Sequence, residues 1–587
     1  MFMVAVTRQA LKNSSLQRFK ANMATFPPFV VTFWHDGFYS EFLPNTDGLT
    51  LRCGLLGPDR SAEGSILCSV KTMNGRHVLS ISNPTILGRT LFFFTNEDGD
   101  FFCSSRIGLL RMAGVRLQEN PDVIPEFMVY RCVTPPASLY KNIQILPPGG
   151  TIELDIHHSC GIRVQSPRLP NYAISDKQPL TQETIKQVEG LLRSGIDNLS
   201  HHAPLYFLLS GGLDSSILFA IGKKQLGVKD SYSASYPFEC LSTKREEEYA
   251  HSAASAFGAA SHHYCSSNEE YLLAFIESIA NAEQPVNHLQ SVMLYLLFKH
   301  KMDKRNGVVV CGYGADSIFG LRTQRQILNF TRRHALYRFL RQPVVVKLMR
   351  ALADLSGKGK SRIDFIEKTR RIHSAYDDPD NIIWDFEKYG SVEWVCDYYG
   401  VNKEKIIQNR LNILKPMLTA SVFDILSILG LAIDSSVTPG IWASLAESTG
   451  NLFYLPYLNE ALMVSSFRIQ WEDKLRQPKY ILRKIARNMH VPEFIITRKK
   501  SGFGANPSLW APKGSLFEPL VGLCTGVFPE AEIRKFQSGE ISQAMTYWNM
   551  LNYALWKKIV LNGESVEDLQ GDVRDRMHFI DRQKSPT

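Results

Sequence analysis

Hydrophobic and polar positions repeat with different periods in the two halves of the chain. Between about residues 29 and 154 they alternate with a period of two, as in 29–34 and 77–82, and this spacing predicts β-strands. Two apolar runs flank an Asn-Glu-Asp-Gly turn at 96–99, which predicts a hairpin. The first half is therefore predicted to be rich in β-strands.

From about Gln182 the apolar residues recur at helical spacing, and strand-like and helix-like segments then follow one another. Residues 205–209 form a short apolar run typical of a buried strand, whereas 246–258 has helical periodicity and ends at a glycine. Alternation of this kind predicts a doubly wound parallel sheet. The pattern is mainly helical over 321–452, which predicts helical additions to that sheet.

A stretch rich in Pro, Asn and Ser at 166–181 separates the two patterns and is predicted to be a linker. We therefore expect an α/β protein with a β-rich domain over 1–165 and a parallel-sheet domain over 166–587. A chain of 587 residues is long enough for roughly two to four domains.

Composition narrows the expected compartment and partners. The net charge of +9 is mild for this length and does not require a nucleic-acid partner. The ten cysteines form no CxxC pair, so neither a zinc ribbon nor a disulfide framework is predicted, and the cytoplasm is the expected location. A run of about 20 apolar residues is absent, so no membrane span is expected.

The most informative stretch follows the apolar run at 205–209. Its glycines allow several backbone N–H groups to converge, and the helix that follows adds positive potential, so the loop predicts an anion site. Asp214 would repel a phosphate unless a cation lay between them, which predicts Mg²⁺ bound to a polyphosphate. The simpler alternative is a serine-glycine turn before a core helix. The small polar residues of this loop are Ser210, Gly211, Gly212, Ser215 and Ser216.

A second glycine-containing loop, at 311–320, follows a run of valines and contains Asp316. Because parallel strands end at one edge of a sheet, Asp214 and Asp316 are predicted to face one another and to share one Mg²⁺. Alone, Asp316 would equally suit a helix N-cap. A basic cluster at 498–500 precedes a glycine-rich turn and suits a leaving pyrophosphate, although an isolated basic run is usually a solvated surface.

Six motifs in order resemble those of the asparagine synthetase family. They are SGGLDSS (210–216), EQP (283–285), GYGADSIFG (312–320), LPYLN (455–459), KYILR (479–483) and RKKSGFG (498–504). The first is also the signature of the ATP-pyrophosphatases, or PP-loop enzymes, which cleave ATP to AMP and pyrophosphate. The end of the N-terminal half is similar to the family's Ntn-type glutaminase domain. The resemblance covers about 75–540, and an ordered set is a stronger signal than one motif.

The resemblance implies a role for each residue that matches a motif. Asp214 and Asp316 would hold Mg²⁺, and Lys500 would contact the pyrophosphate and the transition state. Tyr313 would act in the second, amide-forming step. The residues implied to bind ATP or pyrophosphate are Leu209, Ser210, Gly211, Gly212, Asp214, Ser215, Ser216, Ala234, Cys311, Gly312 and Lys500.

Two departures from the family pattern bear on function. The family's glutaminase needs a cysteine directly after the initiator methionine, but Phe2 stands there, so the N-terminal domain is predicted to be a degenerate, inactive glutaminase. Asparagine synthetases carry Glu where this chain has Tyr313, whereas the related β-lactam synthetases have a tyrosine that works with a downstream Glu. Alignment places Gly440 at that Glu, and Asp434 and Glu447 flank it without a secure match.

Without a glutaminase, the amine must be free ammonia or part of the substrate. Tyr313 could relay the amine proton if Lys500 and Mg²⁺ lowered its pKa. On these features the chain most resembles the lasso-peptide cyclases, which adenylate an Asp or Glu side chain of a precursor peptide and join it to that peptide's N-terminal amine. The resemblance therefore implies an ATP- and Mg²⁺-dependent macrolactam cyclase, with a precursor peptide as substrate and a leader-peptide protease or recognition protein as a candidate partner.

Other functions stay open on the sequence. They are a β-lactam synthetase-like cyclase of a small amino acid, an ammonia-dependent asparagine synthetase homologue, a PP-loop enzyme acting on tRNA, and a non-catalytic scaffold. Retention of Asp214, Asp316 and Lys500 argues against a scaffold, and the lack of paired cysteines argues against the tRNA enzyme. The basic and aromatic region at 322–399 is either a cradle for a peptide or an ordinary helical layer.

Overall fold

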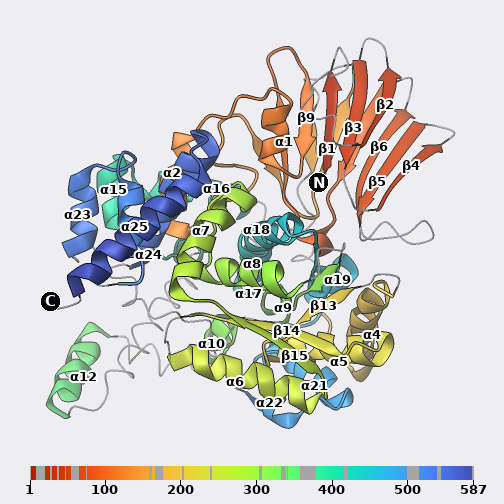
Figure 1. Cartoon of the computed structure of the whole chain (residues 1–587). Coiled ribbons are helices and arrows are strands. Elements are labelled where there is room, and N and C mark those ends of the chain that lie inside the picture. The colour runs from red at the N-terminus through yellow and green to blue at the C-terminus, as the bar shows by residue number, and fades with distance from the viewer. Residues whose placement is uncertain are drawn as a thin grey trace.

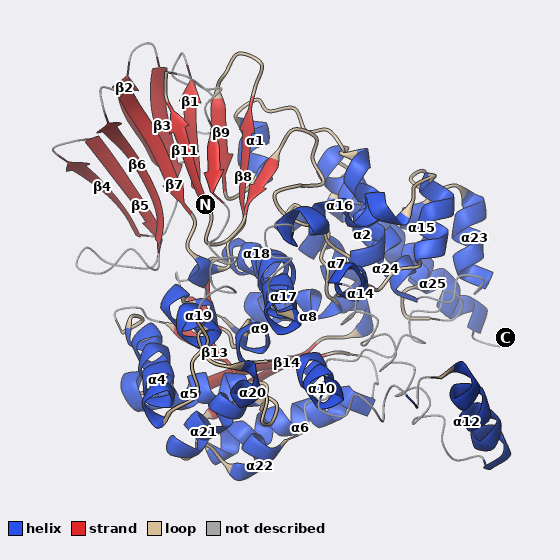
Figure 2. Ribbon diagram, turned by 180° about the vertical axis from the view of Figure 1, so that it is seen from behind, coloured by secondary structure: helices blue, strands red, loops and turns tan. Residues whose placement is uncertain are grey.

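A computed structural model of the chain contains, in its described part, three β-sheets with helices around them (Figures 1 and 2). Most of the predicted linker at 166–181 and the whole of 499–514, with Lys500, lie outside the described residues. The structure describes residues 2–7, 20–26, 29–35, 39–45, 48–54, 65–73, 76–157, 162–165, 176–200, 204–237, 241–302, 307–320, 322–331, 339, 342–356, 379–414, 421–498, 515–538 and 544–584.

Two antiparallel sheets form the N-terminal half, which confirms its predicted richness in β-strands. Their strands are β1 (Phe2–Thr7), β2 (Lys20–Phe26), β3 (Phe29–His35), β4 (Tyr39–Asn45), β5 (Gly48–Gly54), β6 (Ser65–Met73), β7 (Arg76–Ser82), β8 (Leu91–Thr95), β9 (Phe101–Ser104), β10 (Gln144–Leu146), β11 (Thr151–Asp155) and β12 (Arg163–Gln165). The described strands follow the orders β10-β8-β9-β1-β3-β2 and β12-β11-β7-β6-β5-β4. Side chains of both sheets, such as Val4 and Leu79, are buried in one cluster between them. The predicted hairpin is β8–β9.

The first of these sheets is buried on both faces. Val4 and Val6 point into the cluster between the two sheets, whereas Met3 and Ala5 belong to the core of the second half. Since four consecutive residues are buried, β1 shows no alternation of apolar and polar positions, and the sequence did not predict it. The two halves therefore share a continuous hydrophobic core.

The second half contains a parallel sheet. Its described strands are β13 (Leu205–Leu208), β14 (Asp230–Ser235), β15 (Ala260–Cys265), β16 (Val308–Val310) and β17 (Leu452–Tyr454). Their order is β15-β14-β13-β16-β17, and every neighbouring pair is parallel. The strand order reverses between β13 and β16, and ligands bind outside the carboxyl ends of the strands at such a reversal. The sequence predicted β13 from the apolar run at 205–209, β14 from the run at 231–236 and β16 from its valines, but missed β15 and β17.

Helices make up most of the remaining described residues (Figure 2). The α-helices are α1 (Ile107–Met112), α2 (Ile124–Tyr130), α4 (Gln182–Asp197), α5 (Leu213–Leu226), α6 (Leu241–Ala256), α7 (Asn268–Ala282), α8 (Leu289–Lys301), α9 (Ala315–Phe319), α10 (Arg322–Thr331), α12 (Pro343–Ser356), α14 (Pro379–Asp385), α15 (Val392–Tyr399), α16 (Lys403–Leu414), α17 (Val422–Leu429), α18 (Ser435–Ser448), α19 (Glu460–Phe467), α20 (Trp471–Lys474), α21 (Tyr480–Asn488), α22 (Glu493–Thr497), α23 (Glu530–Ser538), α24 (Ala544–Trp556) and α25 (Val566–Lys584). Short 3₁₀ segments are η3 (Thr85–Leu87), η4 (Pro121–Val123), η7 (Pro456–Leu458) and η9 (Glu518–Cys524), and π-helical turns are η6 (Gly430–Asp434) and η10 (Lys557–Leu561).

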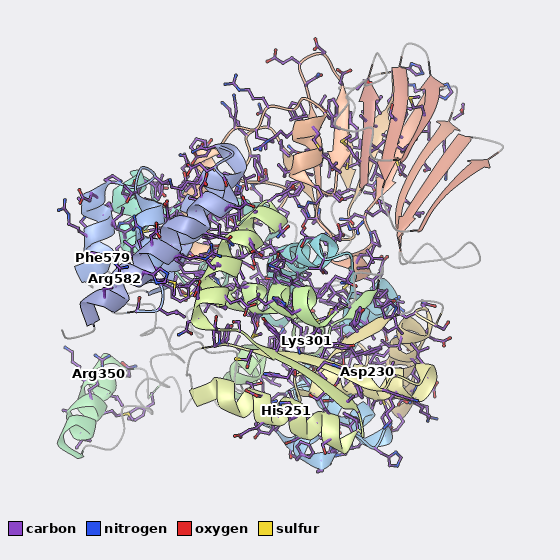
Figure 3. The ribbon with its side chains drawn as sticks, viewed as in Figure 1. Asp230, His251, Lys301, Arg350, Phe579 and Arg582 are labelled. Carbon is purple, nitrogen blue, oxygen red and sulfur yellow. The ribbon has the colours of Figure 1, made fainter. Side chains whose placement is uncertain are left out.

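Helix α12 stands apart from the other described helices and from the sheets in both ribbon views (Figures 1 and 2). Arg350 marks its place in Figure 3. Three of its apolar side chains are largely exposed: Val344, Leu348 and Leu352. Their spacing of four residues places them along one side of the helix.

The stretch Val422–Ser448 runs from α17 through η6 to α18. By length and composition it is apolar enough to cross a membrane, because the mean hydropathy of its most apolar window is 1.4. The sequence analysis expected no such stretch. However, 72% of its most apolar window is buried inside the protein, as in the core helix of a folded domain. The π turn η6 in its middle is a type of helix irregularity often found at functional sites.

Candidate active site

The loop between β13 and α5 has the geometry that its sequence predicted. Gly211 has a φ of +67°, and a Cβ at this position would overlap the backbone of Tyr249, so only glycine fits. The Ser210 and Ser215 hydroxyl oxygens are 3.2 Å apart, and the N–H of Gly212 donates to Ser210 Oγ over 3.4 Å. The loop thus gathers backbone and hydroxyl donors at the N-terminus of the 14-residue helix α5, where an anion is favoured.

Two carboxylates meet beside this loop, as predicted. Asp214, in the first turn of α5, and Asp316, in α9, both form ion pairs with the ammonium group of Lys479, at 2.8 Å for Asp316 Oδ1. Burial favours the neutral form of Lys479, but the two negative charges outweigh it and raise the pKa of this lysine above its ordinary value. Asp316 is not a helix N-cap, because α9 begins at Ala315 after Gly314.

The arrangement fits a divalent cation. Within the described residues, no hydrogen-bond donor reaches the buried Oδ1 of Asp214, and the Lys479 ammonium already stands as a cation between the two carboxylates. The same described residues contain no group of three or more His, Cys, Asp or Glu side chains suited to a metal. Two carboxylates suit Mg²⁺, which is usually bound by one or two carboxylates together with substrate phosphates.

The first residue of the predicted basic cluster at 498–500, Arg498, contacts the same loop. Arg498 donates to the carbonyl oxygen of Ser210 over 3.3 Å and lies over the Tyr249 ring, 3.8 Å from its centroid. Arg498 also forms an ion pair with Glu246. A guanidinium group therefore borders the anion site, although Lys500 lies outside the described residues.

Tyr313 follows β16 and forms a hydrogen-bonded pair with Asp434 of η6. Its hydroxyl donates to Asp434 Oδ2 over 2.6 Å, and its ring packs edge-on against Trp442. Asp434 Oδ1 accepts from Thr438 over 3.3 Å, and His288 Nε2 lies 3.8 Å away. The carboxylate is thus held by donors from two sides.

Electrostatics fix the protonation of this pair. Burial would raise the pKa of Asp434, but the nearby His288, the Tyr313 hydroxyl and Arg131 outweigh burial and lower it. Burial and the charge of Asp434 raise the pKa of Tyr313 well above its ordinary value. The sequence analysis had considered a lowered pKa for this tyrosine. In the structure it is instead a neutral phenol that donates to a carboxylate.

Comparison with known proteins identifies the family to which these loops belong. The sequence model of the asparagine synthase family matches residues 187–524, more than half of the chain. The chain belongs to the asparagine synthase family. No curated protein matches it. Membership supports an ATP-dependent ligase activity of the amide-forming type, and this asparagine synthase-like family uses ATP, typically with Mg²⁺.

The structure also identifies the carboxylate that pairs with Tyr313, which the sequence alone did not assign. Glu447 forms an ion pair with Arg89 and is therefore engaged elsewhere. A Cβ at Gly440 would overlap the hydroxyl of Thr90 from the N-terminal half, so no larger side chain fits there. Asp434 is the residue that Tyr313 contacts.

The remaining residues expected to bind the nucleotide lie at the same edge of the sheet. Leu209 and Cys311 directly follow β13 and β16, and Ala234 is near the end of β14. A Cβ at Gly312 would lie 3.0 Å from the backbone nitrogen of Ser215, so the two glycine loops are in close approach. Their roles stay predictions. Sequence reasoning gave Lys479 no role, although its place in the KYILR motif was a signal that could have found it.

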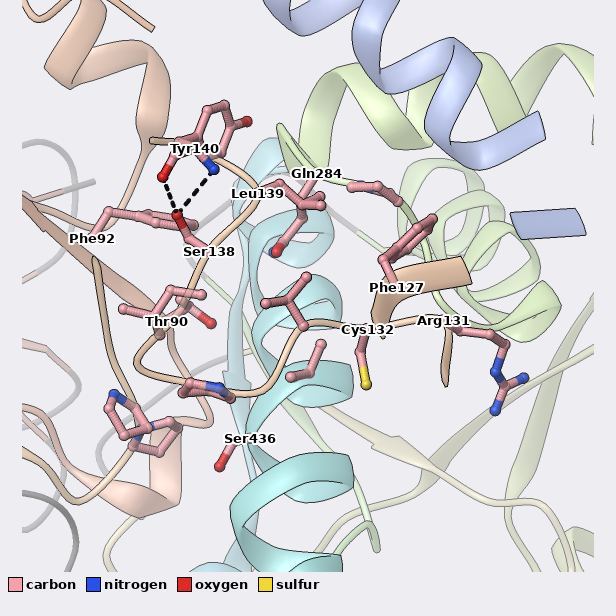
Figure 4. Close-up of a pocket in the computed structure, with 17 residues that line it drawn as sticks. Thr90, Phe92, Phe127, Arg131, Cys132, Ser138, Leu139, Tyr140, Gln284 and Ser436 are labelled. Atoms are coloured by element: carbon pink, nitrogen blue, oxygen red, sulfur yellow. Dashed lines mark hydrogen bonds between the residues drawn. The ribbon is translucent and has the colours of Figure 1, made fainter. Parts of the chain in front are cut away.

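A cavity of about 40 Å³ lies between the two halves (Figure 4). Phe92, Phe127 and Leu139 line it from the N-terminal half, and Gln284 and Ser436 line it from the second. None of the residues expected to bind ATP lines this cavity. In Figure 4 the side chain of Arg131 extends away from the other lining residues.

Proposed function

We propose that this protein is an AMP-forming macrolactam cyclase of the lasso-peptide type, which joins a side-chain carboxylate of a peptide to that peptide's own N-terminal amine. The observation that carries the proposal is the hydrogen bond between Tyr313 and Asp434, close to the loop that holds Asp316. A tyrosine–carboxylate pair suits transfer of an amine proton during ring closure.

In the first step the loop residues hold and orient ATP. The hydroxyl of Ser210, the N–H of Gly212 and the N-terminus of α5 would contact its phosphates. Asp214 and Asp316 would hold Mg²⁺, which when bound neutralises phosphate charge. A carboxylate oxygen of the peptide attacks the α-phosphorus, the bond to the β-phosphate oxygen breaks, and pyrophosphate leaves. Arg498 borders this site, and Lys500 stays the predicted contact of the leaving group.

In the second step the amine nitrogen attacks the activated acyl carbon. A nitrogen–carbon bond forms, the bond from the acyl carbon to the AMP oxygen breaks, and AMP leaves with the electron pair. The proton that the nitrogen loses passes to the Tyr313 oxygen as the proton of Tyr313 moves to Asp434. The distance of 2.6 Å between these two side chains suits such a relay.

A peptide substrate is supported by the region around α12. Residues 322–371 contain 14 Lys and Arg and three Asp and Glu, a net charge of +11, whereas the whole chain carries +9. The rest of the chain is therefore slightly acidic. This basic region carries the exposed apolar row of Val344, Leu348 and Leu352. An acid-bearing peptide with apolar side chains complements this charge composition and the exposed row on α12.

The Tyr313–Asp434 pair also favours a second candidate, ring closure on a small amino acid in the manner of β-lactam synthetases. That reaction uses the same adenylation and the same proton relay. It would leave the exposed row on α12 without a role, and for this reason we favour the peptide.

Substrate-dependent exchange of labelled pyrophosphate into ATP tests the first step. Three sets of substrates are offered: an acid-bearing peptide with a free N-terminus, small β-amino acids, and aspartate with ammonia. Exchange that requires the peptide and Mg²⁺ is the expected result. Exchange only with a small amino acid would favour the second candidate, and exchange with none of the three would contradict the proposal.

A further inference from the structure

Glu387 occupies a strained position near the Tyr313–Asp434 pair. It lies in the turn after α14 with a φ of +53°, a backbone conformation that residues other than glycine rarely adopt. Backbone strain of this kind persists only where the surrounding structure enforces it, and it is concentrated at functional sites. About a third of its side chain, 34%, stays exposed, so the side chain is not sealed inside the protein.

An arginine from the N-terminal half holds this carboxylate. The Arg131 guanidinium lies 3.6 Å from Glu387 Oε2 and 3.4 Å above the Tyr389 ring, and the Tyr389 hydroxyl donates to the same oxygen. Arg131 is itself only 9% exposed and has a φ of +63°. Its buried Nε has no hydrogen-bond partner among the described residues. The pair therefore joins the end of α2 to the turn after α14.

The charged and titratable groups around Glu387 come from several elements. Arg131, directly after α2, and Arg410, on α16, act as positive charges, and Asp434 of η6 acts as a negative charge. Glu387 in turn contributes to the raised pKa of Tyr313, and Arg131 contributes to the lowered pKa values of Asp434 and His288. These groups form one electrostatic cluster, in which the charge of each group affects the pKa values of the others.

The proposed ring closure needs a neutral amine, and the cluster offers few acceptors for the ammonium proton. Asp434 already accepts from Tyr313, and its lowered pKa makes it a weak base. Burial lowers the pKa of His288. Burial and the charge of Asp434 raise the pKa of Glu387 to about 7, against the opposing effect of Arg131 and Arg410. A carboxylate that titrates near neutral pH suits general base catalysis.

We infer that Glu387 is the catalytic base that deprotonates the substrate amine, and that Arg131 is a positioning residue that holds it in place. This inference rests on the proposed function. The Glu387 carboxylate takes one proton from the ammonium group, which leaves a neutral amine with its lone pair. The lone pair then forms the bond to the acyl carbon as AMP leaves with the electrons of the broken bond. The second proton follows the route through Tyr313 to Asp434.

The first test compares Glu387→Gln with the wild type and with Glu393→Gln, which changes an exposed glutamate six residues downstream, outside the cluster. Glu387→Gln is expected to keep peptide-dependent pyrophosphate exchange within about twofold of the wild type. It is expected to slow closure by about 100-fold at neutral pH. The defect should shrink toward about pH 9, because a free α-amino group with a pKa of about 8 loses its proton without help there. Glu393→Gln should behave as the wild type does.

The outcomes of this test distinguish a failure of the role given to Glu387 from a failure of the proposed function. Normal closure in Glu387→Gln, or a defect of equal size at every pH, would overturn the role of Glu387 while leaving adenylation intact. Absence of exchange in the wild type would overturn the proposed function itself, and the assignment of Glu387 would fall with it.

A second measurement needs no substrate. Because the pKa of Glu387 is raised on folding from 4.5 to about 7, its contribution to stability is fully present below pH 4.5 and is lost as the pH rises through 7. The stability of the wild type relative to Glu387→Gln, measured by denaturant unfolding, should therefore fall between these pH values. A constant difference across this window would also overturn the inference.

Discussion

At the scale of single residues, the convergence of Asp214 and Asp316 on one ammonium group is the feature that defines the proposed nucleotide site. The ammonium group of Lys479 pairs with both carboxylates, and the buried Oδ1 of Asp214 has no hydrogen-bond partner among the described residues. The two carboxylates come from different loops, so both loops must be in place before the site exists.

Replacing either carboxylate with an amide should therefore abolish adenylation. Asp214→Asn and Asp316→Asn each remove one of two negative charges, and each is expected to lower pyrophosphate exchange by about 100-fold or more while the fold is kept. Asp230→Asn is the control, because Asp230 pairs with His262 at the start of β14. Near-normal exchange in either variant, with circular dichroism unchanged, would contradict a shared cation site.

Removing one hydroxyl should separate the two chemical steps. Tyr313→Phe keeps the ring that packs against Trp442 but takes away the donor to Asp434. We expect pyrophosphate exchange to continue and ring closure to slow by about 100-fold, as measured by rapid quench of a single turnover. A normal rate of closure would show that Tyr313 moves no proton in the reaction.

The residues that sequence reasoning found and missed differ in a physical way. Asp214 and Asp316 follow glycine loops at the ends of predicted strands, so a local pattern together with the rule for parallel sheets brings them together. Asp434 lies 121 residues from Tyr313 on a π turn inside an apolar helix. A π turn shifts the faces of a helix and leaves no pattern in the sequence, so the partner of Tyr313 required the structure.

At the scale of elements, the predictable strands are those whose apolar run lies beside a turn signal. The hairpin strands β8 and β9 flank an Asn-Glu-Asp-Gly turn and the valine-rich β16 precedes a glycine loop, although β9 and β16 are buried at every position. β1 is likewise buried on both faces, but no turn signal directly follows its short apolar run. The edge strand β15 contains His262 and His263 and only partly buried or exposed positions, so it lacks the apolar run that marks its neighbours.

Helix α12 is the element whose role can be tested separately. Leu348→Asp together with Leu352→Asp should raise the KM for the peptide about tenfold while the KM for ATP stays unchanged, because two exposed apolar contacts are replaced by charges that are poorly suited to an acidic peptide. Met23→Asp is the control, since Met23 is an equally exposed apolar residue on β2, on the side of the molecule away from α12 (Figure 1). Equal effects on both substrates, or none on the peptide, would remove α12 from peptide binding.

At the scale of the whole molecule, the N-terminal half is part of the same folded body as the parallel-sheet half. Arg106 pairs with Glu283 of the EQP motif at 3.1 Å, and the N–H of Leu455 donates to the carbonyl oxygen of Ile86 at 2.8 Å. Thr90 fills the space beside Gly440, and Arg131 reaches Glu387. The proposed ring-closing site therefore contains groups from both halves.

Deletion of residues 1–165 should consequently give a protein that does not fold on its own. The cut would expose the apolar surface of the second half that the N-terminal half now covers, and burial of that surface is a main source of stability. Solubility and the cooperativity of thermal unfolding are the readouts. A soluble truncated protein with full exchange activity would show that the N-terminal half is dispensable.

The central claim is that this chain activates a carboxylate with ATP and closes a ring with an amine of the same substrate. The most direct measurement is mass spectrometry of an acid-bearing peptide incubated with the full-length protein, ATP and Mg²⁺. The account predicts a product lighter by one water, formed together with one AMP, and tandem fragmentation that places the new bond between the N-terminus and an acidic side chain. An unchanged peptide together with conversion of aspartate and ammonia to asparagine would contradict it.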